Sequence, residues 1–407
     1  METRKRRIVE VAIVSSLIQL TVLLLAIGVC VGQTQTPKPE TLVLGFMNPL
    51  SGGAAAWGTA SLGGAEVAVE DINAKGGVTV QGKRYIMRLI VEDDKYNPEV
   101  AMTIGHKFVY RDKVKFFIGP MGSALLEALL PVIITPNKII TATTAFSPIA
   151  KTKYSFVFVS SPAEKGPSFF RFLQEKYPKT SSICIVYPND ASGISVKDTL
   201  TKLGKAAGFT VVGVEAYERG TSDFYPLMSR VTKMKPDIIE YCNSPDGDVA
   251  LMVRSGYELG YKGLNTIGTV DADFVKFVRI AGKEGAEGFI MCRPAAYDSP
   301  DATPKERDIF GRYLQKHGKN APVSVVLMSH YGATWNLARA IEKANTFDPD
   351  VIVDVLEGLN LEMPIGICRF GGQKTYGIKR QLVEPIFYTQ IKDGKGVLIG
   401  KALGECP

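Results

Sequence analysis

The sequence is poor in the residues and motifs that many enzymes need. Its 407 residues include three histidines, His106, His317 and His330, and no pair of them has the spacing of metal ligands on a helix. A Cys-x-x-Cys pair is missing, as are a Gly-x-Gly-x-x-Gly fingerprint after a predicted strand, a Gly-x-x-x-x-Gly-Lys-Ser/Thr phosphate loop and a Gly-x-Ser-x-Gly elbow. We therefore expect no enzymatic activity, no cofactor and no metal ion.

Clustered charge is also scarce. The formal net charge is +7, and the Lys and Arg residues are scattered rather than gathered with aromatic residues, so a nucleic-acid partner is not expected. The acidic run Glu92-Asp93-Asp94 could be a pair of catalytic carboxylates, but three acids at the end of a predicted strand are more typical of a solvated turn. His330, beside Tyr331, could line a site.

The longest apolar run lies at the N-terminus. Residues 4–7 are all basic, and residues 8–32 are almost continuously apolar. This pattern is typical of an export signal, although its length approaches the roughly 20 residues of a membrane span, so a retained anchor is the alternative. Cys30 follows a bulky Val29, which disfavours a lipoprotein signal. We predict that residues 1–32 are a signal peptide or N-terminal anchor of an exported protein.

Cysteine is rare beyond this segment. Cys184, Cys242 and Cys292 lie within apolar, strand-like runs and are expected to be buried thiols. Cys368 and Cys406 lie near the C-terminus and could form a disulfide bridge in an oxidising compartment.

The rest of the chain alternates strand-like and helical patterns. The run from Leu42 to Phe46 predicts a buried strand, and Ala65, Ala68 and Ile72 have helical spacing. The alternation continues without hairpin signals, which indicates parallel sheets. We predict an α/β fold of two Rossmann-like lobes with parallel-sheet cores, joined by a multi-strand hinge. Lobe 1 is expected to comprise residues 41–158 plus about 294–373, and lobe 2 residues 159–293 plus about 374–407.

A set of short motifs follows this alternation in a particular order. They are Leu50-Ser51-Gly52, Trp57-Gly58, Gly64-Ala65, Ala68–Gly77, Asp93-Asp94 before Asn97-Pro98, Ile118–Ser123, Ile140–Thr144, Gly220–Phe224, Pro236-Asp237 and Tyr331-Gly332-Ala333. Together they closely resemble the leucine/isoleucine/valine-type binding proteins of ABC importers. The resemblance implies a type I periplasmic-binding-protein fold, with a solute held between the lobes at the carboxyl ends of the strands.

The resemblance also implies site residues in the first lobe. Ser123 begins a predicted helix after Gly122, where backbone N–H groups and the positive end of the helix dipole suit a carboxylate; a plain N-cap is the simpler alternative. Thr143 and Thr144 follow a predicted strand and could bind the same carboxylate, and Ala145 could shift into register with them. The aromatic residue Trp57, in the first loop, is expected to cover the solute.

The second lobe matches the family less well. Ser192 and Ser244 occupy positions where amino-acid-binding relatives have aromatic residues. The acid that pairs with an α-ammonium group falls near Val270 or Asp271. If Asp271 faces the solute an amine can be held, and if Val270 does the solute can lack one.

The function implied is capture of a small solute, an amino acid, amide or related carboxylate, and its delivery to an ABC permease in the membrane. The protein would act in the periplasm or at the extracellular face of the cytoplasmic membrane. The alternative is a ligand-sensing ectodomain of the same fold, held by an uncleaved N-terminal helix.

Overall fold

The computed structural model describes residues 1–2, 12–15, 19, 39–133, 137–144, 151–268, 274–293 and 302–404. The chain divides into two units, Met1–Glu40 and Thr41–Pro407. Most of the predicted signal or anchor, residues 1–32, lies outside the described residues. Among those that are described, no helix has both the length and the apolar character needed to cross a membrane.

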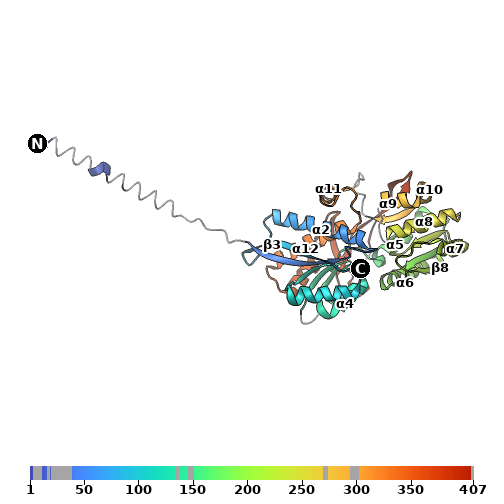
Figure 1. Ribbon diagram of the computed structural model, residues 1–407, viewed down its shortest axis with the longest axis horizontal. Helices are drawn as coiled ribbons and strands as arrows, with labels where there is room; N and C mark the ends of the chain where they lie inside the picture. Colours follow the sequence, from blue (N-terminus) through green and yellow to red (C-terminus); the bar gives the residue numbers. More distant parts are fainter. Residues whose placement is uncertain are drawn as a thin grey trace. The chain divides into compact units, whose positions relative to one another are not determined.

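Two separate sheets organise the second unit (Figure 1). The larger sheet has nine described strands in the order β12-β13-β14-β6-β5-β4-β1-β3-β2, and we call this sheet with its helices the first lobe. Its strands are β1 Glu40–Asn48, β2 Val78–Val80, β3 Lys83–Asp93, β4 Phe116–Ile118, β5 Ile140–Thr143, β6 Ser155–Val157, β12 Leu361–Met363, β13 Gly366–Gly371 and β14 Gln381–Val383. Strands β1, β4, β5 and β6 pair in parallel, which places their carboxyl ends at one edge.

The second lobe is built on the smaller sheet. Seven described strands follow the order β16-β15-β11-β10-β9-β7-β8, with β8, β7, β9, β10 and β11 parallel. They are β7 Ser182–Pro188, β8 Thr210–Tyr217, β9 Ile238–Tyr241, β10 Leu264–Ile267, β11 Ile290–Arg293, β15 Pro385–Lys392 and β16 Lys395–Leu403. The predicted α/β class with two parallel-sheet cores is therefore confirmed.

Antiparallel strands at the edges of both sheets were not predicted. Strands β2 and β3 form a hairpin whose turn residues Gln81 and Gly82 have φ of 50° and 76°. Strands β15 and β16 form a second hairpin, turning at Asp393 and Gly394 with φ of 51° and 76°. Positive φ at both central residues suits the twist of a tight hairpin, and Asp-Gly is a common signal for it, whereas Gln-Gly is not.

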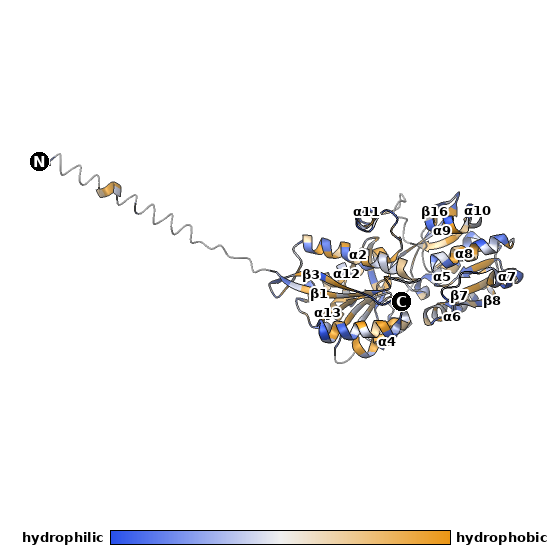
Figure 2. Cartoon of the chain, viewed as in Figure 1, coloured by the Kyte–Doolittle hydropathy of each residue, from blue (hydrophilic) through white to orange (hydrophobic). Residues whose placement is uncertain are grey.

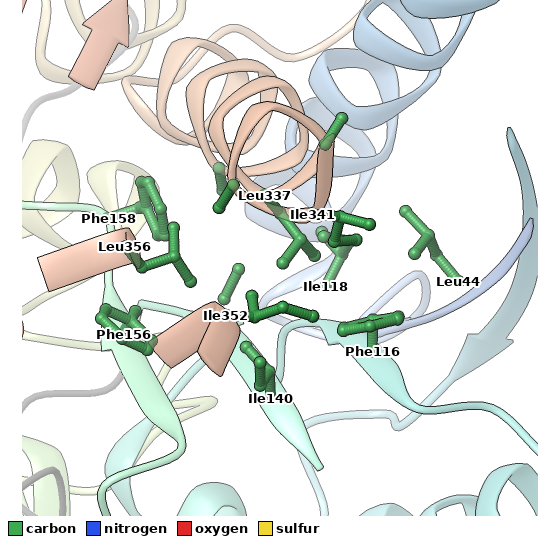
Figure 3. Close-up of a cluster of buried hydrophobic side chains, with 14 of the residues drawn as sticks. Leu44, Phe116, Ile118, Ile140, Phe156, Phe158, Leu337, Ile341, Ile352 and Leu356 are labelled. Carbon is green, nitrogen blue, oxygen red and sulfur yellow. The ribbon is translucent and has the colours of Figure 1, made fainter. Parts of the chain in front are cut away.

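Helices flank both faces of the first sheet. They include α2 Ala55–Ala74, α3 Pro98–His106, the π-helical turn η1 Lys107–Arg111, α4 Ser123–Ile133, α11 Pro304–His317, α12 Val326–Ala344, α13 Pro349–Gly358 and the short α14 Gln373–Tyr376. Successive side chains of β1 face opposite sides of the sheet and enter two different cores. Leu44 and Phe46 pack with α12 and α13, and Met47 packs with α3 and α4. Figure 3 shows strand side chains such as Ile118 facing Leu337 of α12 and Ile352 of α13.

The second sheet has its own helices and core. They are α5 Pro162–Lys176, α6 Ala191–Ala206, α7 Tyr225–Lys233, α8 Asp246–Glu258, α9 Phe274–Ala281 and α10 Lys283–Ala286. The strands of both sheets are largely hydrophobic in Figure 2, while the helices carry mixed faces. Cys184 and Cys242 are buried free thiols and Cys292 is buried, as predicted. Cys368 is also a buried free thiol, and Cys406 lies outside the described residues.

The chain passes between the two described sheets three times, after β6, after β11 and after β14. Because β14 pairs with β13 and β6, the first sheet extends to Val383, past the boundary near residue 373 that the sequence indicates. Glu384 alone separates β14 from β15, and its carboxylate accepts the Ser160 N–H of the first passage at 3.0 Å. The Gln381 amide donates to the Val159 carbonyl at 2.7 Å. The first bond ties two of the connecting segments together, and the second ties the first of these segments to β14.

Candidate solute-binding site

The carboxyl ends of β4 and β5 meet the start of α4. Gly122 has φ of 98°, a conformation that glycine adopts without strain, and Ser123 begins the helix with 1% of its surface exposed. The Thr143 hydroxyl donates to the Pro120 carbonyl at 2.5 Å, which joins the two strand ends. Thr144 is 7% exposed, and among the described residues its hydroxyl oxygen has no hydrogen-bond partner. Four predicted site residues therefore lie at this edge.

The sequence analysis placed Trp57 in a loop, and the structure shows that this prediction is wrong. It belongs to the first turn of α2, where its half-buried ring packs against a cluster of side chains from α11, α12 and the loop before α4. Small residues on both sides of Trp57 suggested that it has no helical face on which to pack. The neighbouring Gly58 lets this turn of α2 pack closely against Pro49, whose carbonyl oxygen would be 1.7 Å from a Cβ at position 58. Met121, next to Gly122, belongs to the same cluster.

In the second lobe, Ser192 lies in the first turn of α6. Asp190 caps this helix by accepting the Gly193 N–H at 2.8 Å, and Ser192 is 6% exposed. Its hydroxyl oxygen accepts the backbone N–H of Ser123 at 3.4 Å. The structure thus brings together Ser123 and Ser192, two predicted site residues from different lobes.

The remaining predictions for the second lobe have different outcomes. Ser244 follows β9 and is buried, and its hydroxyl donates to the Cys242 carbonyl at 3.1 Å. Asp271 and its alternative Val270 lie outside the described residues, as does Ala145 of the first lobe. Gly268, the last described residue before that segment, donates its N–H to the buried Glu240 carboxyl group at 3.0 Å.

Two residues at the contact between the lobes, Tyr96 and Arg219, were missed by the sequence analysis. Tyr96 lies in the turn after β3, and the Arg219 guanidinium lies over its ring, 5.5 Å from the centroid. Arg219 also forms an ion pair with Asp190. The Asp93-Asp94 pair was a usable signal for Tyr96, because aspartates often accept N–H groups two residues ahead in turns.

That acidic run is not the solvated turn that the sequence suggested. Asp94 is fully buried, and burial raises the pKa of its carboxyl group to about 7. One carboxyl oxygen accepts the Tyr96 N–H at 2.8 Å, while the other has no hydrogen-bond partner among the described residues. Asp93 accepts the N–H of Leu50 at 2.8 Å and so anchors the loop before α2. These acids organise loops at the candidate site.

His330, which the sequence analysis named as a possible lining residue, is 1% exposed. One ring nitrogen lies 2.9 Å from the Val326 carbonyl oxygen and the other 3.2 Å from the Asn48 side-chain nitrogen. Burial lowers the pKa of His330 to about 4. The ring is therefore neutral at physiological pH, and both of its nitrogens are engaged within the core.

The two α/β lobes, the three connections between them and the polar residues at the facing strand ends define a two-lobed solute receptor. Residues 41–395 match the periplasmic binding protein family, and the chain belongs to that family. Members of this family are exported to the periplasm and bind solutes rather than catalyse reactions.

Two relatives illustrate the family in sequence. A leucine-, isoleucine-, valine-, threonine- and alanine-binding protein from Pseudomonas aeruginosa is 24% identical over 334 residues, which cover 81% of this chain and 86% of the relative. A Leu/Ile/Val-binding protein from Rhizobium johnstonii is 26% identical over 352 residues, covering 85% and 90% of the two chains. The resemblance identified from the motifs is therefore confirmed.

Two solved structures share the fold. One is a branched-chain amino acid transporter substrate-binding protein from Streptococcus pneumoniae in complex with isoleucine, with a TM-score of 0.73, 19% identity, and coverage of 90% of this chain and 100% of the other. The other is an ABC transporter solute-binding protein from Rhodopseudomonas palustris in complex with 3,4-dihydroxybenzoic acid, with a TM-score of 0.75, 18% identity, and coverage of 90% and 99%. The type I periplasmic-binding-protein fold is thus confirmed.

Proposed function

We propose that this protein captures an amino acid, or a related small carboxylate or amide, between its two lobes and delivers it to an ABC permease. The observation that carries the proposal is the Thr144 hydroxyl, which is buried at the carboxyl edge of the first sheet and lacks a hydrogen-bond partner among the described residues. A buried polar group without a partner costs free energy. A solute carboxylate at this edge would supply the missing acceptor.

The start of α4 supports the same assignment. The first N–H groups of a helix have no acceptor within that helix, and the helix dipole places partial positive charge at this end. The Ser123 N–H reaches Ser192 only at 3.4 Å, a long distance for such a bond. A carboxylate between Ser123 and Thr144 would be a stronger acceptor than a serine hydroxyl, because it carries a full negative charge.

The other proposed contacts would enclose the rest of the solute. In the first lobe, Trp57 would cover it and Ala145 would extend the strand end of β5. In the second lobe, Ser192 and Ser244 would provide small polar surfaces, and Asp271 would pair with an ammonium group. The relatives that were solved with isoleucine and with 3,4-dihydroxybenzoic acid keep both amine-bearing and amine-free solutes open for this chain.

A thermal-shift screen with matched solutes tests this proposal. Leucine, 4-methylpentanoate, which lacks the ammonium group, and leucinamide, which lacks the carboxylate, share one side chain. A solute at 100 times its Kd should stabilise the protein by about 2.7 kcal/mol. A shift with leucine alone supports an amine contact such as Asp271, and a shift with 4-methylpentanoate supports an amine-free solute. If amino acids, amides and aromatic carboxylates all leave the melting temperature unchanged, the proposal is wrong.

Replacing Thr144 with valine should weaken binding of the solute found in that screen by about tenfold or more, because a hydrogen bond to a charged group is removed. Folding stability without solute should rise slightly, because the substitution removes a buried hydroxyl that has no hydrogen-bond partner among the described residues. Thr334→Val is the matched control: Thr334 is fully buried on α12 and its hydroxyl also lacks a described partner. Isothermal titration calorimetry should show unchanged affinity for that control. Equal affinity of Thr144→Val and the wild type would rule out the contact.

A further inference from the structure

We infer that Tyr96 and Arg219, together with Ser123 and Ser192, form a clasp that holds the two lobes closed when no solute is bound. The inference concerns regulation of the proposed site and rests on the proposed function for its biological consequence. The closure itself is inferred from contacts between the two lobes.

The first lobe presents Tyr96 from an unusual backbone conformation. Lys95 and Tyr96 have φ of 53° and 56°, which non-glycine residues rarely adopt. Asp93 and Asp94 hold this turn by accepting the N–H groups of Lys95 at 2.9 Å and Tyr96 at 2.8 Å. A Cβ at Gly122 would lie 2.9 Å from the Tyr96 hydroxyl oxygen, so the glycine leaves room for the ring beside the start of α4. Strain of this kind is often retained at functional sites.

The second lobe presents Arg219 in a fixed orientation. Its guanidinium pairs with Asp190, and one of its nitrogens lies 3.5 Å from the Asn243 carbonyl oxygen. The Arg219 side chain is 24% exposed and lies over the Tyr96 ring of the other lobe. An attraction between a cation and an aromatic ring strengthens as both lose water, so this contact favours closure.

A single hydroxyl completes the clasp. Ser192 accepts the Ser123 N–H at 3.4 Å. Burial raises the pKa of the Tyr96 phenol, which lies beside the start of α4. The Ser123 N–H is the group that the proposed function assigns to a solute carboxylate. Ser192 therefore competes with a solute carboxylate for this N–H, and a solute can reach it only after the lobes separate.

The test uses the purified full chain, freed of co-purified solute by unfolding, dialysis and refolding. The clasp predicts a larger radius of gyration by small-angle X-ray scattering for Tyr96→Ala and for Arg219→Met than for the wild type. It also predicts that hydrogen exchange at the Ser123 amide becomes about fivefold faster or more in both variants. Tyr96→Phe should retain the ring contact with Arg219 and give a smaller increase.

Matched controls distinguish loss of the clasp from the general effect of removing a positive charge or an aromatic ring. Arg230 forms an ion pair with Glu215 at 3.1 Å on the surface of the second lobe, and Tyr225 is 48% exposed on α7. Arg230→Met and Tyr225→Ala should leave both measurements at the wild-type values. If Tyr96→Ala fails to fold, Arg219→Met still decides the question, because Asp190 keeps its bond to Gly193 at the start of α6.

The inference is overturned if folded Arg219→Met, the decisive variant, has the radius of gyration and the Ser123 exchange rate of the wild type. Both measurements are made without solute, so they do not depend on whether the proposed solute class is correct. Failure of every solute in the thermal-shift screen would refute the proposed function and leave the measured closure unaffected.

Discussion

Replacing Glu240 with glutamine is expected to stabilise the protein by about 4 kcal/mol at pH 8 and to change its stability little near pH 4. Glu240 lies on β9 and is fully buried, and burial raises the pKa of its carboxyl group to about 8. Its hydrogen-bond partners are the uncharged Thr266 hydroxyl at 2.6 Å and the Gly268 N–H at 3.0 Å. Neither partner carries a positive charge that would neutralise an ionised Glu240 carboxylate.

The sign of this change in stability follows from the number of protons that the folded and unfolded states bind. Between the ordinary pKa of glutamic acid, near 4.5, and the value of about 8 in the folded protein, the folded state holds a proton that the unfolded state has lost. Stability contributed by Glu240 is therefore complete below pH 4.5 and declines as the pH rises towards 8. Glutamine stays neutral, and its amide can donate to the Thr266 oxygen while its carbonyl accepts the Gly268 N–H.

Urea unfolding at pH 5, 7 and 8 measures the effect, because the advantage of the variant should grow at each step. Glu384→Gln is the matched control. Glu384 is also buried and burial raises its pKa, but the positive charge of Lys165 opposes this shift, so glutamine should give a smaller gain there. A pH-independent difference between Glu240→Gln and the wild type would contradict the assignment. Gly268 leads into the segment that contains Asp271, so a change in solute binding would link Glu240 to the site.

Replacing Gly64 with alanine is expected to destabilise the protein by about 3 kcal/mol. Gly64 lies in α2 where this helix packs against α12, and a Cβ there would be 1.9 Å from the Leu327 carbonyl oxygen and 2.9 Å from the Tyr331 nitrogen. Both are backbone atoms, so no side-chain rotation relieves the overlap. The two helices must separate, and close packing between them is lost.

Gly311→Ala is the control for this change. Gly311 lies in α11 and is exposed, and a Cβ there would meet no atom within 4 Å. Alanine has a higher helix propensity than glycine, so this variant should gain up to about 1 kcal/mol. Chemical denaturation of both variants gives the comparison. Equal stability of the Gly64→Ala variant and the wild type would mean that the helices are packed less closely than the structure indicates.

Much of the candidate site could be predicted from local patterns. Ser123 at the start of α4 and Thr144 at the end of β5 both follow short apolar runs, and the strand-end placement follows from the parallel sheet. Trp57 was placed in a loop because small residues surround it, and local propensity does not register that Gly58 packs against Pro49. The β2–β3 hairpin was missed because Gln81-Gly82 is a weak turn signal. The β15–β16 hairpin was missed although Asp393-Gly394 is a common signal, and its place in the sheet depends on distant partners.

The sequence by itself determined the α/β alternation and the two parallel cores, because hydrophobic periodicity and glycine-rich turns act over a few neighbouring residues. The family followed from the resemblance of the ordered motifs to leucine/isoleucine/valine-type binding proteins. The tertiary structure alone decided that Tyr96 meets Arg219 and that Ser192 takes the N–H of Ser123. These residues belong to different lobes, and no local pattern encodes how two separately folded sheets face each other. Burial of Asp94 and Glu240 was decided in the same way, because the surroundings that raise the pKa of each carboxyl group come from many segments of the chain.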